Sequence, residues 1–209
     1  MKIKVAPSIL SADFGRLNEE VASVESYSDL IHVDVMDGHF VSNITIGVPV
    51  VRCIETGLPL DVHLMIDSPE DYIEDFVKAG ADYITVHFEA CKDVKGALKM
   101  IQKYGIGVGI SIKPGTKVQV LKPYLHLLDL ILIMSVEPGF GGQKFMSSAL
   151  EKIKWLREQG FKGEISVDGG INGETGSACV KAGASILVAG NYIFGAKNRQ
   201  KACESLRGK

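Results

Sequence analysis

The sequence predicts a single-domain (β/α)₈ barrel, a TIM barrel, over residues 1–209. Short apolar segments typical of buried strands occur eight times, about 25 residues apart. Amphipathic segments separate them, and strands that alternate with helices form parallel sheets with right-handed crossovers. The length of 209 residues is close to the lower limit of about 200 for this fold. A doubly wound open sheet is the alternative, but no glycine-rich dinucleotide fingerprint follows the first strand and no Walker sequence is present.

The eight predicted strands are short runs of β-branched and other apolar residues, bounded by polar or glycine-containing turns. In this fold class the sheet is covered on both faces, so its strands are expected to be apolar on both sides. We place the strands at residues 3–8, 30–36, 59–66, 82–87, 106–112, 129–136, 163–168 and 185–190.

The clearest helix between the strands is expected over residues 69–79. Ser68 is placed to cap its N-terminus, and Pro69 occupies the first helical position, where no N–H is needed. Gly80 follows as the residue that ends the helix, because glycine readily adopts the left-handed conformation found there. A helix of this kind is what connects two parallel strands.

Composition and charge exclude several classes of protein. Hydrophobic residues make up 46% of the chain and the net charge is −2, which gives no reason to expect nucleic acid or a membrane surface as a partner. The four cysteines form no CxxC pair, so we expect reduced thiols and a cytoplasmic location. A strand begins almost at the N-terminus, which leaves no room for a signal peptide, and no apolar run approaches the roughly 20 residues of a membrane span. Apolar faces on the outer helices favour a homo-oligomer.

One predicted strand carries polar side chains in a buried position. Alternation along residues 30–38 places His32, Asp34 and Met36 on one face and only branched apolar residues on the other. Burying an unpaired carboxylate costs several kcal/mol, so Asp34 requires a charged partner, most simply a metal ion. A solvated strand end is the alternative. A second stretch of the same kind, at residues 61–65, favours the metal ion.

Polar residues gather at the carboxyl ends of the predicted strands, where barrel enzymes have their active sites. His63 lies on the third strand and Asp168 ends the seventh. With His32 and Asp34 they form a set of two imidazoles and two carboxylates that suits one divalent ion, Zn²⁺, Fe²⁺, Mn²⁺ or Co²⁺. The ligand types do not choose among these ions. His87, at the end of the fourth strand, is expected to form a hydrogen bond to a ligand rather than to bind directly.

A divalent ion flanked by two carboxylates indicates proton removal next to a carbonyl group. The ion acts as a Lewis acid towards an enolate oxygen. Because a carboxylate is a weak base towards carbon, stabilisation of an enediolate must supply most of the barrier reduction. If Asp34 and Asp168 flank opposite faces of this intermediate, one removes the proton and the other returns it, which inverts the carbon. Met36, Met65 and Met134 either cap the intermediate or simply fill the core.

Glycine-rich loops follow the sixth, seventh and eighth strands. Glycine lets backbone N–H groups approach an anion closely, and barrel enzymes often bind phosphate with the loops after strands 7 and 8. Tight turns also need glycine, so the occurrence in three neighbouring units is what indicates a phosphorylated small substrate. These loops hold no Lys or Arg, so backbone dipoles would bind the phosphate. The residues are Gly139, Phe140, Gly141, Gly142, Gly169, Gly170, Gly190 and Asn191.

With these residues identified, the chain resembles the ribulose-phosphate 3-epimerase family over essentially its whole length. The segments that carry the resemblance are 6–14 (APSILSADF), 32–40 (HVDVMDGHF), 61–65 (DVHLM), 134–143 (MSVEPGFGGQ) and 167–171 (VDGGI). Members of this family are (β/α)₈ barrels that interconvert D-ribulose 5-phosphate and D-xylulose 5-phosphate in the pentose phosphate pathway. The resemblance therefore implies a phosphorylated ketose as the substrate.

The resemblance also implies roles for individual residues. Asp34 would be the proton acceptor and Asp168 the proton donor, with the roles exchanged in the reverse direction. Ser8 and His63 would contact the sugar. The residues implied to hold the divalent ion are His32, Asp34, His63 and Asp168, and those implied at the phosphate end are Gly139 to Gly142, Gly170, Gly190 and Asn191.

Two departures from the family pattern concern the choice of substrate. The family usually has Val-Pro-Asn where this chain has Val41-Ser42-Asn43, which predicts a looser loop near the substrate. It usually has serine in place of Asn191. Because asparagine is an equally good helix N-cap and keeps its backbone N–H, phosphate binding is expected to survive. D-Allulose 6-phosphate, the six-carbon substrate of a related epimerase, is the second candidate.

Two other functions on the same barrel are weighed against an epimerase. A non-catalytic sugar-phosphate sensor is expected to have lost a carboxylate or a metal ligand, and this chain retains all four. A decarboxylase or aldolase typically needs a lysine at a strand end. Lys113 is the only candidate, and the turn over residues 114–116 that follows it favours a structural or solvent-exposed position.

Overall fold

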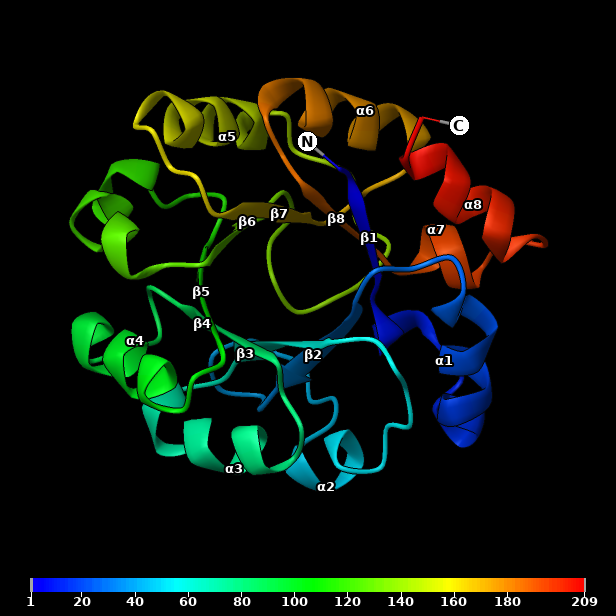
Figure 1. Ribbon diagram of the computed structural model, residues 1–209, viewed down its shortest axis with the longest axis horizontal. Coiled ribbons are helices and arrows are strands. Elements are labelled where there is room, and N and C mark those ends of the chain that lie inside the picture. The colour runs from blue at the N-terminus through cyan, green and yellow to red at the C-terminus, as the bar shows by residue number, and fades with distance from the viewer. Residues whose placement is uncertain (1, 209) are drawn as a thin grey trace.

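A computed structural model describes residues 2–208, and it confirms the predicted (β/α)₈ barrel. Eight parallel strands form one sheet in the order β1-β8-β7-β6-β5-β4-β3-β2, surrounded by helices (Figure 1). Each strand lies within its predicted range and is shorter by one to three residues. The strands are β1 (Lys4–Pro7), β2 (Ile31–Met36), β3 (Leu60–Met65), β4 (Tyr83–His87), β5 (Gly107–Ile112), β6 (Leu130–Met134), β7 (Glu164–Asp168) and β8 (Ile186–Ala189).

The barrel closes between β1 and β2 through a few specific contacts rather than a continuous ladder. Ser8 and His32 form an isolated parallel bridge. At the other end, the backbone N–H of Asp29 donates to the Val5 carbonyl (2.9 Å), and the Asp29 carboxylate accepts the Val5 N–H (3.0 Å). A side chain thus replaces part of the backbone pairing that the other strands make with one another.

The helices form an outer ring around the strands (Figure 1). None of those within residues 2–208 is long and apolar enough to cross a membrane. The α-helices are α1 (Leu17–Glu25), α2 (Val48–Val51), α3 (Ile73–Lys78), α4 (Val94–Lys103), α5 (Ser148–Glu158), α6 (Gly173–Ala182), α7 (Asn191–Phe194) and α8 (Arg199–Leu206). The 3₁₀ helices are η1 (Ile9–Ser11), η2 (Phe14–Arg16), η3 (Pro69–Asp71) and η4 (Val118–Leu127).

The helix predicted over residues 69–79 is interrupted, and its predicted cap is wrong. The segment begins as η3 and continues as α3, and Ser68 makes no side-chain capping hydrogen bond. Ser68 has a left-handed backbone with φ of 50°. The following proline disfavours the right-handed helical region for this residue, and the left-handed backbone lies outside the extended region that N-cap residues adopt. Gly80 does end the helix as predicted, with φ of +105° and its N–H bonded to the Val77 carbonyl.

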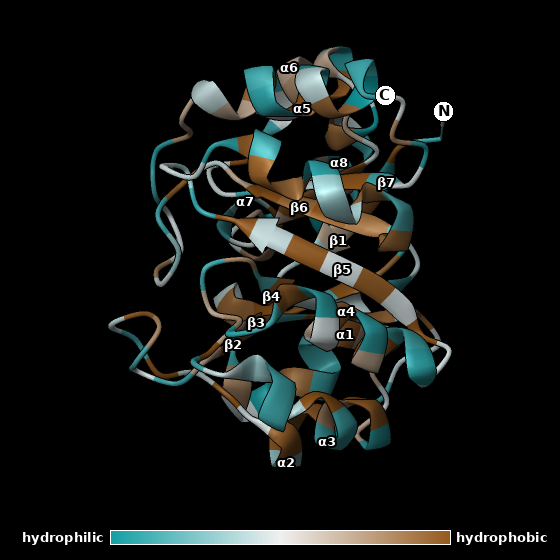
Figure 2. Cartoon of the chain, turned by 90° about the vertical axis from the view of Figure 1, so that its left-hand side faces the viewer, coloured by the Kyte–Doolittle hydropathy of each residue, from teal (hydrophilic) through white to brown (hydrophobic). Residues whose placement is uncertain are grey.

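Side chains alternate between the barrel interior and the layer under the helices. Figure 2 shows that hydropathy also alternates from residue to residue along β5. Leu130, Leu132 and Ile186 belong to an apolar cluster inside the barrel, whereas Ile131 and Leu187 pack with the helices. Because all eight strands run in parallel, their carboxyl ends meet at one face, from which the long loops project (Figure 2). The four cysteines are free thiols, as predicted.

Candidate active site

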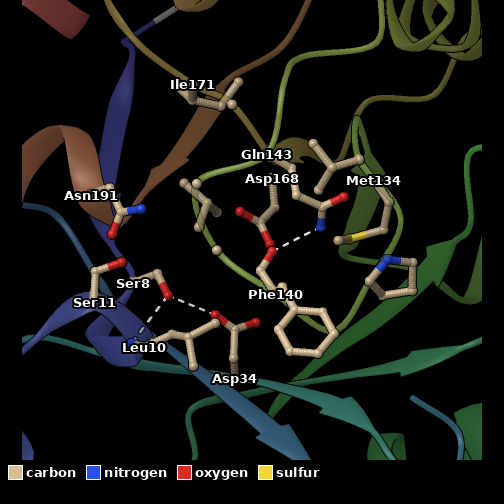
Figure 3. A pocket seen from close by; sticks show the side chains of 18 of the residues that line it. Ser8, Leu10, Ser11, Asp34, Met134, Phe140, Gln143, Asp168, Ile171 and Asn191 are labelled. Carbon is tan, nitrogen blue, oxygen red and sulfur yellow. Dashed lines mark hydrogen bonds between the residues drawn. The ribbon is translucent and has the colours of Figure 1, made fainter. Parts of the chain in front are cut away.

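A pocket opens at the face where the strands end (Figure 3). Ser8 follows β1, Asp34 lies on β2, and Asp168 ends β7. The loops after β6, β7 and β8 complete the wall with the glycines that the sequence singled out. Figure 3 shows the carboxylates of Asp34 and Asp168 pointing into the pocket from two sides.

The four predicted metal ligands converge. One ligand atom each from His32, Asp34, His63 and Asp168 lies within 4.8 Å of the others. The cause is register: β2 and β3 are neighbours, and Asp34 pairs with His63. Both histidine rings are fully buried beneath the pocket wall, to which only the two aspartates contribute. The predicted contact between His63 and the sugar therefore stays a prediction.

His32 has the environment of a metal ligand. Its Nδ1 lies 2.8 Å from Asp61 Oδ2, while its buried Nε2 lies 3.3 Å from Asp34 Oδ1 and has no hydrogen-bond partner among the described residues. Despite burial, the charges of Asp34 and Asp61 raise the pKa of His32 well above its ordinary value. The site therefore favours a positive charge, and a divalent ion bound to Nε2 would supply it while Asp61 holds the ring in place.

Asp34 is held by contacts to both of its carboxylate oxygens. Its Oδ2 accepts a hydrogen bond of 2.6 Å from the Ser8 hydroxyl, and its Oδ1 lies 3.0 Å from His63 Nδ1. Burial opposes ionisation, but the charge of His32 and the close approach of both histidine rings hold the pKa of Asp34 well below its usual range. Asp34 is therefore a carboxylate at neutral pH.

The pKa of Asp168 is shifted in the opposite direction from that of Asp34. Its enclosed position, together with the negative charge of Asp34, raises its pKa to about 7. Two carboxyl groups whose surroundings push their pKa values apart are suited to act as a base and an acid in one reaction. A bound cation would lower the pKa of both groups.

His87 contacts the predicted metal ligand His63, as expected from the sequence. Its Nε2 lies 2.9 Å from His63 Nε2, and its Nδ1 lies 3.2 Å from Glu89 Oε2. Burial lowers the pKa of His87 to about 4 and also lowers that of His63, which favours neutral rings. Sequence reasoning missed Asp61 and Glu89. Asp61 lies two residues before His63 on the same face of β3, so the alternation that identified His63 could also have found it. Glu89 lies in the turn two residues after the end of β4, where strand alternation gives no signal.

The three methionines are buried and line the pocket. Met36 and Met65 pack with Val41, Leu10 and Phe40 in an apolar cluster of their own. Of this cluster, Leu10, Met36 and Met65 form an apolar part of the pocket wall. Asn43, from the loop expected to be looser than in the family, donates a 2.8 Å hydrogen bond to the Gly139 carbonyl and so ties the two loops together.

The glycine loops approach one another closely. A Cβ on Gly142 would lie 2.8 Å from Asn191 Nδ2, and one on Gly190 would lie 2.4 Å from the hydroxyl of Ser11. Ser11 also lines the pocket and was missed by sequence reasoning. Asn191 is the first residue of α7 rather than its cap, because the chain is already helical there, and Gly190 precedes it as N-cap.

Lys113 does not line the pocket. Its Nζ lies 3.9 Å from the centre of the Phe40 ring, in a cation–π contact. The lysine that a decarboxylase or an aldolase would place next to its substrate is therefore held on an aromatic ring outside the pocket. This agrees with the predicted structural position of Lys113.

Comparison with known proteins identifies close relatives. Residues 4–194 match the profile described as "Ribulose-phosphate 3 epimerase family". The ribulose-phosphate 3-epimerase of Bacillus subtilis is 50% identical, with 99% of each chain covered. That of Chlamydia trachomatis is 47% identical, with 92% of this chain and 86% of that protein covered. The crystal structure of orotidine 5'-phosphate decarboxylase from Pyrococcus horikoshii has a TM-score of 0.70 at 18% identity, covering 97% of each chain, which is a likeness of fold alone.

Proposed function

The chain belongs to the ribulose-phosphate 3-epimerase family of enzymes, and on this basis we propose that it interconverts D-ribulose 5-phosphate and D-xylulose 5-phosphate by epimerisation at C3. One observation carries the proposal: Asp34 and Asp168 point into the same pocket, and their surroundings shift their pKa values in opposite directions. Epimerisation needs such a pair, because a proton must leave one face of the carbon and another must arrive on the opposite face.

The chemistry of the donor set supports a metal ion in this reaction. His32, Asp34, His63 and Asp168 would hold one divalent ion, Zn²⁺, Fe²⁺, Mn²⁺ or Co²⁺, as imidazole nitrogens and carboxylate oxygens. The buried Nε2 of His32, which has no hydrogen-bond partner among the described residues, fits this assignment. When bound, the ion would supply Lewis-acid stabilisation of the negative charge that develops on the substrate oxygens.

In the forward direction Asp34 removes the C3 proton and a planar cis-enediolate forms. The Ser8 hydroxyl, bonded to Asp34 Oδ2, fixes the orientation of this base. Asp168 then delivers a proton to the other face of C3, which inverts that carbon and gives D-xylulose 5-phosphate. In the reverse direction the two aspartates exchange roles.

The rest of the pocket wall binds the substrate and excludes water. Met36, Met65 and Met134 present polarizable thioethers next to the reacting carbon. At the other end, backbone N–H groups of the loops after β6, β7 and β8 would bind the phosphate, because their glycines let an anion approach closely.

The test is incubation of the metal-loaded enzyme with D-ribulose 5-phosphate in D₂O, followed by NMR at C3, with D-allulose 6-phosphate in a parallel reaction. We expect deuterium at C3 together with formation of D-xylulose 5-phosphate. Faster conversion of the six-carbon substrate would contradict the choice of pentulose while preserving the reaction type. No deuterium incorporation into either sugar phosphate by protein with bound metal would contradict an epimerase and favour the non-catalytic sensor.

A further inference from the structure

We propose that Glu89 is a positioning residue which, acting through His87, holds His63 in the tautomer whose Nδ1 is unprotonated and free to bind a metal ion. Neither Glu89 nor His87 belongs to the predicted ligand set or lines the pocket. The inference rests on the metal site of the proposed function and adds a role for two residues outside it.

The contacts form one continuous chain beneath the pocket. Asp34 Oδ1 lies 3.0 Å from His63 Nδ1, and His63 Nε2 lies 2.9 Å from His87 Nε2. His87 Nδ1 lies 3.2 Å from Glu89 Oε2. Both rings are fully buried, so water cannot substitute for these partners.

The outer end of the chain is fixed by the loop after β5. Glu89 Oε1 accepts the backbone N–H of Lys113 at 2.8 Å and the Thr116 hydroxyl. That loop is itself held by Lys152, whose Nζ donates to the carbonyls of Lys113 (2.9 Å) and Pro114 (2.7 Å). Glu89 therefore has one oxygen occupied by two donors and the other directed at His87.

The number of N–H groups on the two rings fixes the direction in which the hydrogen bonds of this chain run. Two neutral imidazoles carry one N–H each. The Glu89 carboxylate only accepts, so His87 carries its proton on Nδ1. The unprotonated Nε2 of His87 must then accept from His63 Nε2–H, because two lone pairs would otherwise face each other. The remaining nitrogen, His63 Nδ1, then keeps a lone pair that faces the Asp34 carboxylate 3.0 Å away. This contact has no proton, and a cation bound where the four predicted ligands converge would satisfy both groups.

A glutamine at position 89 would reverse this direction. The two donors at the Oε1 position would select the amide oxygen, which leaves the amide NH₂ facing His87 Nδ1. His87 would then carry its proton on Nε2 and donate to His63 Nε2, and His63 Nδ1–H would donate to Asp34. Every group would remain hydrogen-bonded, so the fold would survive, but the nitrogen that faces the metal position would carry a proton.

The experiment compares wild type, Glu89→Gln and Thr116→Val, each stripped of metal and titrated with Zn²⁺ against a competing chelator. We expect Glu89→Gln to bind Zn²⁺ about 10- to 100-fold more weakly, as is typical when a group behind a metal ligand is altered. Thr116→Val removes one donor to Oε1 but keeps the carboxylate that faces His87, so its Zn²⁺ affinity should stay within about twofold of wild type.

¹⁵N NMR of the histidine rings separates tautomer selection from a merely structural role. We expect Nε2–H on His63 in metal-free wild type and Nδ1–H on His63 in metal-free Glu89→Gln, with cooperative thermal unfolding of both metal-free proteins. Equal Zn²⁺ affinities of wild type and Glu89→Gln would overturn the inference and leave the proposed function intact. A wild type that binds no Zn²⁺ and none of Mn²⁺, Fe²⁺ or Co²⁺ would overturn both.

Discussion

Asp34 and Asp168 face each other across one pocket, yet their surroundings lower the pKa of the first and raise that of the second to about 7. The difference arises from their partners. Asp34 is contacted by Ser8 and by two imidazoles, whereas Asp168 is affected mainly by burial and by the charge of Asp34 itself. The charge of Asp34 thus helps to raise the pKa of Asp168, and the predictions at the site follow from this asymmetry.

The first prediction concerns the two aspartates separately. Asp34→Asn and Asp168→Asn should each lower epimerisation by about 10²- to 10⁴-fold, the usual contribution of a general acid or base, without unfolding. Asp168→Asn should still exchange the C3 proton of D-ribulose 5-phosphate with D₂O, because Asp34 remains. Asp34→Asn should exchange only D-xylulose 5-phosphate. NMR of each epimer distinguishes these reactions, and full turnover by either folded variant would contradict the two-base mechanism.

The second prediction concerns the metal. Exhaustive chelation should abolish activity, and added Zn²⁺, Mn²⁺, Co²⁺ or Fe²⁺ should restore it, because ligand sets of imidazole and carboxylate accept all four. Circular dichroism before and after chelation checks that the fold is retained. Unchanged turnover by protein shown to be metal-free by elemental analysis would refute the role of the ion.

The third prediction concerns Ser8. Removing its hydroxyl in Ser8→Ala deletes the 2.6 Å hydrogen bond to Asp34. A hydrogen bond to a charged group contributes about 1.5–3 kcal/mol, so kcat should fall about 10- to 100-fold. Steady-state kinetics measure this, and an unchanged kcat would show that the hydroxyl does not orient the base.

The fourth prediction concerns phosphate binding. Gly142 has φ of +74°, and a Cβ there would lie 2.8 Å from Asn191 Nδ2, so Gly142→Ala should raise KM for the sugar phosphate. Gly105→Ala is the matched control, because Gly105 has φ of +72° and a Cβ added there would meet no heavy atom within 4 Å. Both variants should lose about 1 kcal/mol of stability from the left-handed backbone. An equal rise in KM for both would indicate general destabilisation instead.

The fifth prediction concerns pH and barrel closure. Burial opposes ionisation of Asp29, but the Val5 N–H, Lys2 and Arg207 together lower its pKa. A group with a lowered folded-state pKa stabilises the protein above its unfolded pKa of about 4, and this contribution is lost as the pH falls through the folded value. Denaturant unfolding should therefore show wild type losing stability below about pH 4. Asp29→Asn should be less stable at pH 7 and less sensitive to acid in that window.

Much of the site followed from local sequence pattern. Alternation placed His32 and Asp34 on one strand face, and the parallel topology required His63 and Asp168 to meet them at the same end of the barrel. These inferences succeeded because side-chain direction along a strand has a fixed period of two, and because a closed parallel sheet brings all carboxyl ends together.

The sequence by itself determined the barrel, its polar rim and the residues that gather there, since periodicity and strand order depend only on neighbours along the chain. The tertiary structure decided how those residues pair. The left-handed turn at Ser68, the burial of His63 beneath the pocket wall, and the chain from Glu89 through His87 depend on register and on loops far apart in sequence. Hydrogen bonds form between atoms within about 3 Å, and only the folded barrel brings these atoms that close.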